Sequence, residues 1–324
     1  MVTIAGKERF LLLPEDTPIP ETQIPEGVGT DITVLRKPLT HLYLAASSAM
    51  DFFCRLDALD AVRLSGTSAA NWSLAQARDA LESGRILYAG KYSAPDFELL
   101  LRENCPLAIE STMIYHSPDI REQLEALGIP VLVERSSYER HPLGRMEWIK
   151  LYGLLVDREA EADAFFDAQT AALADVLAAE NSGKSAAFFS LSSNGYATVR
   201  KPGDYVTKMI ELAGGQYAFS GVIPEEENAL STMRLQMELF YAGAKEADIL
   251  IYNGTIDGGM ETLAQLLDKS ALLAECRAVR SGDVWCTEQN LFQETTAAAG
   301  VIAELHQIFT GSAGDALTYF RRLR

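Results

Sequence analysis

The sequence predicts an α/β protein with two Rossmann-like lobes, each with a mainly parallel sheet, joined by one long α-helix. Three observations predict this class. Short apolar runs alternate with helical patterns in the first half of the chain, the same alternation returns after residue 181, and residues 157–180 contain no glycine or proline. A chain of 324 residues also exceeds what one ordinary core supports. We therefore expect an N-terminal lobe (1–156), a bridging helix (157–180) and a C-terminal lobe (181–324).

The N-terminal lobe alternates apolar runs of strand length with segments whose apolar residues lie three and four positions apart. Strand, helix and strand at this spacing favour right-handed crossovers and a parallel sheet covered on both faces. The expected strands are 42–46, 62–64, 85–88, 107–109 and 129–133, and the expected helices are 49–59, 73–81, 95–102 and 118–127.

The bridging helix has acidic residues near its start, where the helix dipole favours negative charge, and the segment 181–183 (NSG) just after it supplies a stop signal. At 1.5 Å per residue it would be about 36 Å long. In the C-terminal lobe the expected strands are 186–189, 249–252 and 284–286, and the expected helices are 205–212 and 233–244.

Composition excludes several classes of protein. A net charge of −17 argues against nucleic-acid binding, which requires a basic face. The four cysteines form no CxxC pair, so we expect free thiols and no structural metal. No apolar run reaches the length of about 18 residues that predicts a membrane span. The first residues of the sequence as written are not a basic and then an apolar segment, so we expect no secretory signal among them.

Polar side chains are concentrated where the predicted strands end, and in open parallel sheets ligands bind outside the carboxyl ends of the strands. The candidate ligand-binding residues of the N-terminal lobe are Ser47, Ser48, Lys91, Tyr92, Ser111, Thr112, Arg135, Ser136, Tyr138 and His141. Those of the C-terminal lobe are Ser193, Asn194, Tyr196, Arg200, Asn253, Thr255, Gln289 and Phe292.

Cations are prominent in these loops, although the chain as a whole is acidic. They are Lys91, Arg135, Arg140, Arg145, Arg200 and Lys201. A local excess of positive charge around a binding site favours an anionic ligand. The stretch from Glu134 to Trp148, which follows a predicted strand, contains three of these arginines, two serines, a tyrosine and a histidine.

The order of several short segments resembles a known family. They are Pro95–Glu98 (PDFE) followed by 107–109 (LAI), 127–131 (LGIPV), 147–150 (EWIK) leading into the long helix, and 209–215 (MIELAGG). This arrangement is similar to the substrate-binding proteins of ABC importers, in the group that captures ferric siderophores, haem and cobalamin. The similarity covers nearly the whole chain from about Asp31.

This resemblance implies a binding protein rather than an enzyme, with no catalytic residues, no metal ligands of its own and no cofactor. The ligand, most readily a ferric siderophore, would lie in a cleft between the lobes, and one glutamate on each lobe would dock on the permease. Glu98 matches the first of these glutamates and Glu238 is the candidate for the second, although its spacing to Asp248 is about two residues longer than the usual pattern. The resemblance also implies a monomer located in the periplasm or lipid-anchored on the cell surface.

Other ligands and functions stay open at this point. For haem, Tyr138 or His141 could supply an axial ligand. For cobalamin, the aromatic side chains that could pack on a corrin are Tyr92, Tyr138, Tyr196 and Phe292. A bare zinc or manganese site would need the N-lobe histidines to converge, namely His41, His116 and His141. An enzyme is disfavoured because the sequence has no GxSxG, HExxH or strand-following GxGxxG motif.

Overall fold

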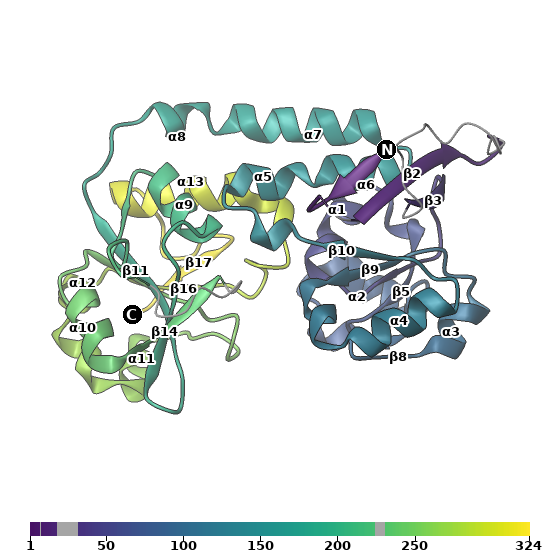
Figure 1. Cartoon of the computed structure of the whole chain (residues 1–324). Coiled ribbons are helices and arrows are strands. Elements are labelled where there is room, and N and C mark those ends of the chain that lie inside the picture. Colours follow the sequence, from purple (N-terminus) through teal and green to yellow (C-terminus); the bar gives the residue numbers. More distant parts are fainter. Residues whose placement is uncertain (7, 18–31, 224–230) are drawn as a thin grey trace. The chain divides into compact units, whose positions relative to one another are not determined.

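A computed structural model describes residues 1–6, 8–17, 32–223 and 231–324 (Figure 1). The chain forms two compact units. Unit 1 contains Met1–Arg135 and Glu147–Phe166, and unit 2 contains Ser136–Met146 and Asp167–Arg324. The chain therefore passes from one unit to the other three times, and the cation-rich segment after Arg135 belongs to unit 2 rather than to the sheet that precedes it.

The sheet of unit 1 has five strands, all parallel, in the order β10-β9-β4-β5-β6. The strands are β4 (Leu42–Leu44), β5 (Val62–Ser65), β6 (Leu87–Tyr88), β9 (Ala108–Ser111) and β10 (Val131–Glu134). Successive residues face opposite cores: Leu42 and Leu44 join one apolar cluster, while Tyr43 joins the other. Burial of both faces explains why these strands read as continuous apolar runs, and it confirms the predicted α/β class with a parallel sheet.

Helices cover both faces of this sheet (Figure 1). On the face of Leu42 lie α1 (Met50–Arg55), α2 (Ala75–Glu82) and α6 (Ile149–Leu155). On the face of Tyr43 lie α3 (Phe97–Arg102) and α4 (Pro118–Ala126). A small pair of antiparallel strands, β7 (Gly90–Lys91) and β8 (Ala94–Pro95), precedes α3 in the chain. Helix α5 (Pro142–Glu147) precedes α6.

An additional three-stranded sheet at the N-terminus was not predicted. It contains β1 (Val2–Ile4), β2 (Glu8–Pro14) and β3 (Ile32–Lys37). Ile4, Phe10 and Leu35 attach this sheet to the core of unit 1. The carboxylate of Glu8 pairs with Arg121 and accepts a hydrogen bond from the backbone N–H of Val133 on β10, an edge strand of the main sheet. A residue of the small sheet thus accepts a hydrogen bond from a backbone N–H of the edge strand that no neighbouring strand pairs with.

The sheet of unit 2 is mixed, with the main order β14-β12-β11-β15-β16-β17. Its strands are β11 (Ser185–Leu191), β12 (Tyr196–Arg200), β14 (Thr232–Gln236), β15 (Ile249–Tyr252), β16 (Val284–Thr287) and β17 (Phe320–Arg322), with β13 (Gln216–Tyr217) pairing the start of β11. Parallel pairing joins β13 to β11, β11 to β15 and β15 to β16, whereas β12 pairs antiparallel with β11 and with β14, and β17 pairs antiparallel with β16. The helices of this unit are α9 (Tyr205–Leu212), α10 (Met237–Ala244), α11 (Leu263–Lys269), α12 (Arg277–Ser281) and α13 (Ala298–Thr310).

Two predictions of secondary structure were wrong in this half of the chain. The segment 233–244 was expected to be one helix, but 232–236 pairs with β12 as β14 and the helix begins only at Met237. The expected continuous helix over 157–180 consists of α7 (Glu159–Ala172) and α8 (Ala174–Ala178). Leu173, between them, keeps a right-handed helical conformation, and its N–H bonds to Thr170 three residues back instead of four, so the interruption is a local tightening.

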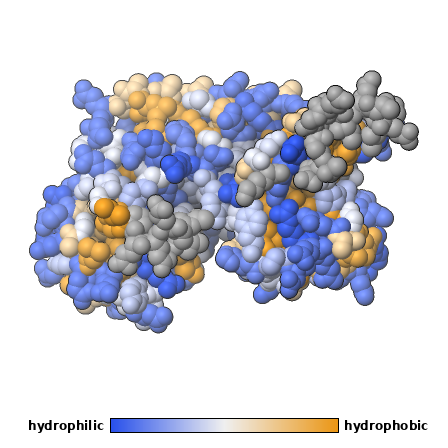
Figure 2. Space-filling model, in the orientation of Figure 1, coloured by the Kyte–Doolittle hydropathy of each residue, from blue (hydrophilic) through white to orange (hydrophobic). Residues whose placement is uncertain are grey.

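Hydrophilic residues cover most of the visible surface of each unit, with scattered apolar side chains among them (Figure 2). No helix in the described part of the chain is both long enough and apolar enough to cross a membrane.

Candidate functional site

The strand-end surface of unit 1 is formed by the loops that follow β4, β9 and β10. Ser48 follows β4, and its hydroxyl donates a 2.6 Å hydrogen bond to the Glu134 carboxylate, which is buried at the end of β10. The Ser111 hydroxyl accepts a bond from the N–H of Met113 and caps the short helix at 112–116. The structure therefore gives part of the predicted polar set a local structural role, and leaves other members facing outward.

Arg135 donates a 3.3 Å hydrogen bond from Nη1 to the phenol oxygen of Tyr115. Tyr115 is about half exposed, as is Met113 two residues earlier. These two side chains extend the predicted surface, although neither was predicted from the sequence. The predicted residues of the loop after β9 are Ser111 and Thr112, whereas the helical turn at 112–116 continues along the same surface.

Lys91 and Tyr92 lie at the turn between β7 and β8, and Lys91 is exposed. The turn depends on Gly90, which has φ +80° and whose added Cβ would lie 2.3 Å from the carbonyl oxygen of Ala94. The Tyr43 hydroxyl, which comes from the buried sheet, donates to the Gly90 carbonyl at 2.9 Å. The position of this turn is therefore fixed by the core of unit 1.

Glu110 precedes Ser111 on β9, but its side chain points into the core. It is fully buried, and neither carboxylate oxygen has a hydrogen-bond partner among the described residues. Burial raises the pKa of Glu110 to about 8, because the charged form loses its hydration. At neutral pH this residue is therefore mainly a neutral acid within the wall beneath the strand-end surface.

In unit 2, Asn253, Thr255 and Gln289 are held together at the ends of β15 and β16. The Asn253 side-chain oxygen accepts bonds from the N–H and the hydroxyl of Thr255, and the Gln289 amide donates to the carbonyl of Gly254 at 2.7 Å. The N–H of Gly254 donates to the Thr287 hydroxyl at 2.9 Å. The three predicted residues therefore form one connected polar loop cluster.

Ser193, Asn194 and Tyr196 lie on the β-hairpin between β11 and β12. Gly195 has φ +77°, as a tight hairpin turn requires, and the Ser192 hydroxyl bonds to the backbone of Tyr196. All three predicted side chains are exposed. Arg200 is on the same hairpin but further along β12, opposite Thr232 of β14 and away from the turn.

Two buried arginines share an aromatic cluster in unit 2. Arg200 forms a two-point ion pair with Asp204, with N–O distances of 2.8 and 3.0 Å. Its guanidinium lies 5.2 Å from the Tyr205 ring centroid and 5.5 Å from that of Phe292. The guanidinium of Arg145 lies 4.4 Å from the centroid of Tyr205. The structure thus brings together two of the predicted residues, Arg200 and Phe292, around a tyrosine that the sequence-based selection did not include.

The remaining predicted residues precede α5. Ser136 is fully buried, whereas Tyr138 and His141 are exposed. The His141 ring accepts a hydrogen bond at Nδ1 from the N–H of Leu143. Desolvation, and then the positive charge of Lys208, lowers the pKa of His141, so the neutral imidazole is favoured.

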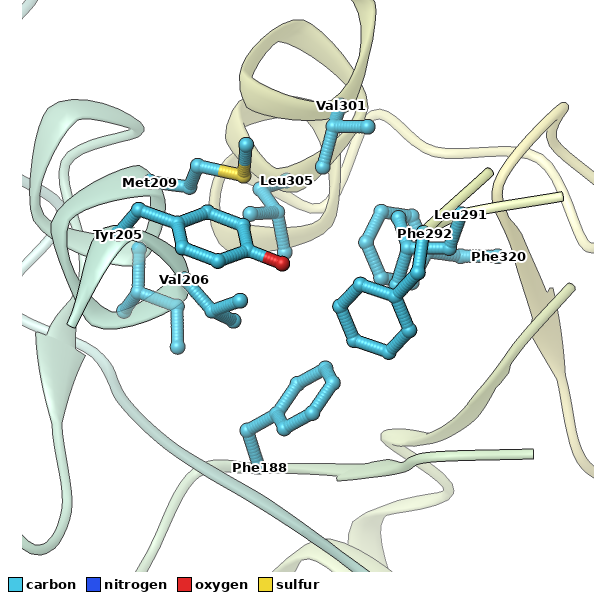
Figure 3. A pocket seen from close by; sticks show the side chains of 10 residues that line it. Phe188, Tyr205, Val206, Met209, Leu291, Phe292, Val301, Leu305 and Phe320 are labelled. Carbon is cyan, nitrogen blue, oxygen red and sulfur yellow. The ribbon is translucent and has the colours of Figure 1, made fainter. Parts of the chain in front are cut away.

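An apolar cavity adjoins the arginine cluster (Figure 3). Tyr205 and Phe292 are common to the cluster and the cavity, and the Tyr205 hydroxyl points into the cavity. The other lining side chains come mainly from β11, α9 and α13, among them Phe188, Met209 and Leu305. The cavity volume is about 20 Å³, which is room for about one water molecule.

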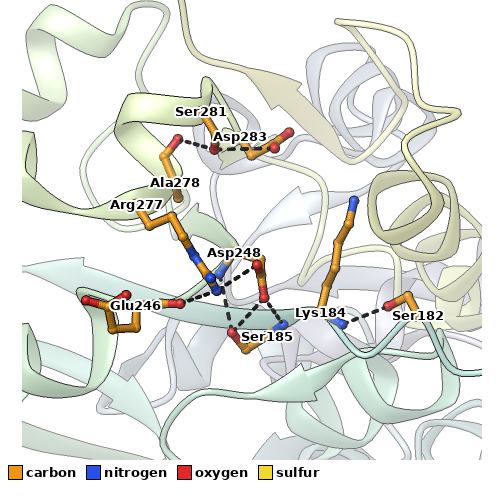
Figure 4. Close-up of polar contacts among 9 residues, drawn as sticks. All are labelled: Ser182, Lys184, Ser185, Glu246, Asp248, Arg277, Ala278, Ser281 and Asp283. Carbon is orange, nitrogen blue, oxygen red and sulfur yellow. Dashed lines mark hydrogen bonds and ion pairs between the residues drawn. The ribbon is translucent and has the colours of Figure 1, made fainter.

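The amino ends of β11 and β15 in unit 2 carry a hydrogen-bonded group of polar and charged side chains (Figure 4). Asp248, just before β15, accepts hydrogen bonds from the N–H and hydroxyl of Ser185 and pairs with Arg277 at 2.7 Å. Arg277 also donates to the carbonyl of Glu246. Asp248 and Arg277 therefore compensate each other's charge at this end of the sheet.

Among the described residues, no three histidine, cysteine or acidic side chains gather closely enough to hold a metal ion. His41 lies at the amino end of β4, His116 in the turn after β9, and His306 in α13, where its ring contacts the Ala213 carbonyl.

The model of the periplasmic binding protein family matches residues 55–291, which is most of the chain. The chain belongs to the periplasmic binding protein family. The resemblance drawn from the short segments of the sequence is therefore confirmed, and the family is one of binding proteins.

Individual relatives of this periplasmic binding protein are distant. It is 23% identical over 302 residues to an uncharacterized lipoprotein of Methanocaldococcus jannaschii, covering 89% of this chain and 69% of the relative. Its fold is similar to that of the periplasmic haem-binding protein HutB of Vibrio cholerae, with a TM-score of 0.66, 17% identity, and coverage of 85% and 100% of the two chains. It is also similar to a protein of the Fe3+-hydroxamate transport system of Saccharomonospora viridis, with a TM-score of 0.60, 21% identity, and coverage of 83% and 92%.

Proposed function

We propose that this periplasmic binding protein is the extracytoplasmic component of an ABC importer and delivers an iron chelate, a ferric siderophore, to the permease. The observation that carries the proposal is the placement of cations and aromatic side chains. In a chain of net charge −17, Arg135 lies at the strand-end surface of unit 1, and Arg145 and Arg200 pack on Tyr205 in unit 2. Guanidinium groups suit the carboxylate, catecholate or hydroxamate oxygens of such a chelate.

The family and the distant relatives support a binding role outside the cytoplasm. The family is that of periplasmic binding proteins, and one relative is named a lipoprotein. Two structural relatives carry names that refer to haem and to ferric hydroxamate. In the proposed function the iron arrives with its coordination complete, the protein makes no covalent bond, and residues of the strand-end surfaces contact the ligand.

Docking on the permease is proposed to use Glu98 and Glu238. Each is the second residue of a helix that directly follows a short strand, Glu98 on α3 and Glu238 on α10. Both are exposed, and neither forms an ion pair with any described residue. Each also has an exposed leucine beside it, Leu101 in unit 1 and Leu239 in unit 2. Free carboxylates with adjacent apolar side chains suit a partner surface that presents cations.

A ligand panel tests the proposed cargo. Purified protein is mixed with ferric siderophores, haem, cobalamin and zinc, and followed by native mass spectrometry and visible absorption. We expect one ferric siderophore to bind and Arg135→Ala to weaken that binding by more than about tenfold. Arg85→Ala is the matched control, because Arg85 is exposed at the amino side of β6. No binding across the panel, together with hydrolytic or lyase turnover, would count against the proposal.

Haem is the second candidate, and one observation favours it. Tyr115 is about half exposed, its phenol oxygen accepts a hydrogen bond from Arg135, and a tyrosine oxygen is one of the protein ligands that hold haem iron. If haem is the cargo, Tyr115→Phe will shift the visible spectrum of the complex. If a siderophore is the cargo, the same substitution will leave the charge-transfer band of the chelate in place.

A further inference from the structure

We propose that Arg145 is the anion-binding residue of unit 2 and takes an anionic oxygen of the cargo, from a carboxylate or a catecholate. This inference rests on the proposed function, in which the cargo is an anionic chelate. It assigns the uncompensated charge of the buried cluster to Arg145 rather than to Arg200.

Arg145 is held by weak, neutral contacts. Its side chain is almost wholly buried, with 4% of the residue exposed. Nη2 donates to the carbonyl oxygen of Phe292 at 3.4 Å and to the hydroxyl of Thr295 at 3.3 Å, both long for hydrogen bonds. Nε is buried and has no acceptor among the described residues. A guanidinium with five donors is therefore only partly satisfied, and no described carboxylate forms an ion pair with it.

The carboxylate in this cluster, Asp204, is already used. Its two oxygens accept from Nε and Nη2 of Arg200 in a two-point pair, and Oδ1 also accepts from the N–H of Val206 at the start of α9. Arg200 and Arg145 lie against the same ring, Tyr205. The cluster thus contains two guanidinium groups and one carboxylate. Because Asp204 neutralises Arg200, the positive charge without an anionic partner among the described residues is that of Arg145.

The surroundings make that charge costly and limit what can neutralise it. Tyr205 and Phe292, which contact the two guanidinium groups, also line the apolar cavity of Figure 3. A cation beside apolar walls loses hydration that only a partner can replace. The cavity has room for about one water molecule, so the body of a chelate cannot enter it. A single anionic oxygen that replaces the Phe292 carbonyl or approaches Nε fits these limits.

The test uses the full chain with Arg145→Met, which keeps the side-chain length and removes the charge. Arg145→Lys keeps the charge, and Arg277→Met is the matched control at the compensated amino end of the sheet (Figure 4). The probes are the trianionic tris(catecholato)iron(III) complex, a neutral iron(III) trihydroxamate, and 2,3-dihydroxybenzoate alone. Affinity is measured by fluorescence quenching and stability by thermal unfolding.

We expect Arg145→Met to weaken binding of the trianionic complex by more than about tenfold and of the neutral complex by less than about threefold. Arg145→Lys should lose less than Arg145→Met. Without ligand, Arg145→Met should unfold at the same or a higher temperature than the unmodified protein, because an uncompensated buried charge has been removed. Arg277→Met should bind both complexes normally.

Unchanged affinity for the trianionic complex in Arg145→Met would overturn the inference, and a lower unfolding temperature with normal binding would identify Arg145 as a structural anchor instead. If the unmodified protein binds neither complex, the proposed cargo is wrong. The inference then stands only if 2,3-dihydroxybenzoate alone raises the unfolding temperature of the unmodified protein but not that of Arg145→Met.

Discussion

Glu110 shows how a single residue can couple the stability of unit 1 to pH. Its carboxyl group lies in the core between the strand-end surface and the helices α3 and α4, with both oxygens unpartnered among the described residues. The titratable side chains that pack nearby, Tyr43 and Cys105, have pKa values raised by burial and stay neutral. No described side chain compensates a negative charge here, which is why burial raises the pKa of Glu110 to about 8.

The pH dependence has a definite sign. Below pH about 4.5 Glu110 is protonated in the folded and unfolded chains, so it adds no pH dependence. Between about 4.5 and 8 the unfolded chain loses a proton that the folded chain keeps, and stability falls as pH rises. Replacing Glu110 with Gln removes this loss.

We therefore predict that Glu110→Gln matches the unmodified protein near pH 4 and is more stable at pH 8 to 9, by on the order of a few kcal/mol. Urea unfolding at a series of pH values measures this difference. Glu122→Gln, on the exposed face of α4, is the control and should follow the unmodified protein throughout. A Glu110→Gln curve parallel to that of the unmodified protein would show that Glu110 is ionised in the folded state.

Residue roles in the site were only partly predictable. The rule that ligands bind at the carboxyl ends of parallel strands selected Arg135, Arg200 and Phe292, which the structure places beside Tyr115 or Tyr205. That rule cannot say which arginine has a carboxylate partner. Arg200 lies at the end of β12 and Asp204 caps α9 four residues later, which brings the two side chains together. Arg145 instead contacts Tyr205 and Thr295, which are about 60 and 150 positions away in the sequence.

At the scale of elements, strands buried on both faces were predictable and strands paired antiparallel were not. The strands β4, β9, β10, β15 and β16 read as short apolar runs because both of their faces are covered. The sequence of β14 also suits a helix, so it was predicted to form the first turn of α10. Its pairing with β12, a contact distant in sequence, overrides that local preference.

The loop after β15 is the element whose packing most directly shapes the site of unit 2. A Cβ added at Gly254 would lie 2.6 Å from the Cys286 sulfur, 2.9 Å from the α-carbon of Gly259 and 2.9 Å from the Thr287 carbonyl oxygen. Two of these neighbours are backbone atoms, which cannot move aside without moving the loop. The same loop carries Asn253 and Thr255 and is bonded to Gln289.

We predict that Gly254→Ala destabilises the protein by about 1–3 kcal/mol and weakens ligand binding, because the loop must shift away from β16. Gly221→Ala is a matched control: its Cβ would meet nothing within 4 Å, and its backbone, like that of Gly254, does not require positive φ. Thermal unfolding and ligand titration of both variants measure the contrast. Equal behaviour of the two alanine variants would mean that the loop tolerates the added carbon.

At the scale of the whole molecule, the proposed function assigns two separate tasks to different surfaces. Ligand binding uses the strand-end surfaces, whereas docking uses Glu98 of unit 1 and Glu238 of unit 2. The two glutamates contact none of the ligand-binding candidates in any hydrogen bond or ion pair among the residues described. Docking and binding should therefore respond to different substitutions.

We predict that Glu98→Ala with Glu238→Ala leaves ligand affinity within about twofold and weakens association with the permease by at least about tenfold. The effect should diminish as salt is added, because exposed charges are screened. Glu122→Ala, another exposed glutamate without an ion pair among the described residues, is the control. Pull-down with the permease in nanodiscs and ligand titration measure the two quantities. Loss of ligand binding in the double variant would show that these glutamates belong to the ligand-binding surface and not to a separate docking surface.

The four cysteines have a practical consequence. All are free, three are buried, and burial raises the pKa of Cys54 to about 12 and those of Cys105 and Cys286 to about 11. Their thiols stay protonated near neutral pH and react slowly with maleimides. A cysteine introduced on the exposed hairpin, as in Ser193→Cys, would then carry a fluorophore almost alone, and the native protein would need no prior removal of its own thiols to become an optical sensor for its cargo.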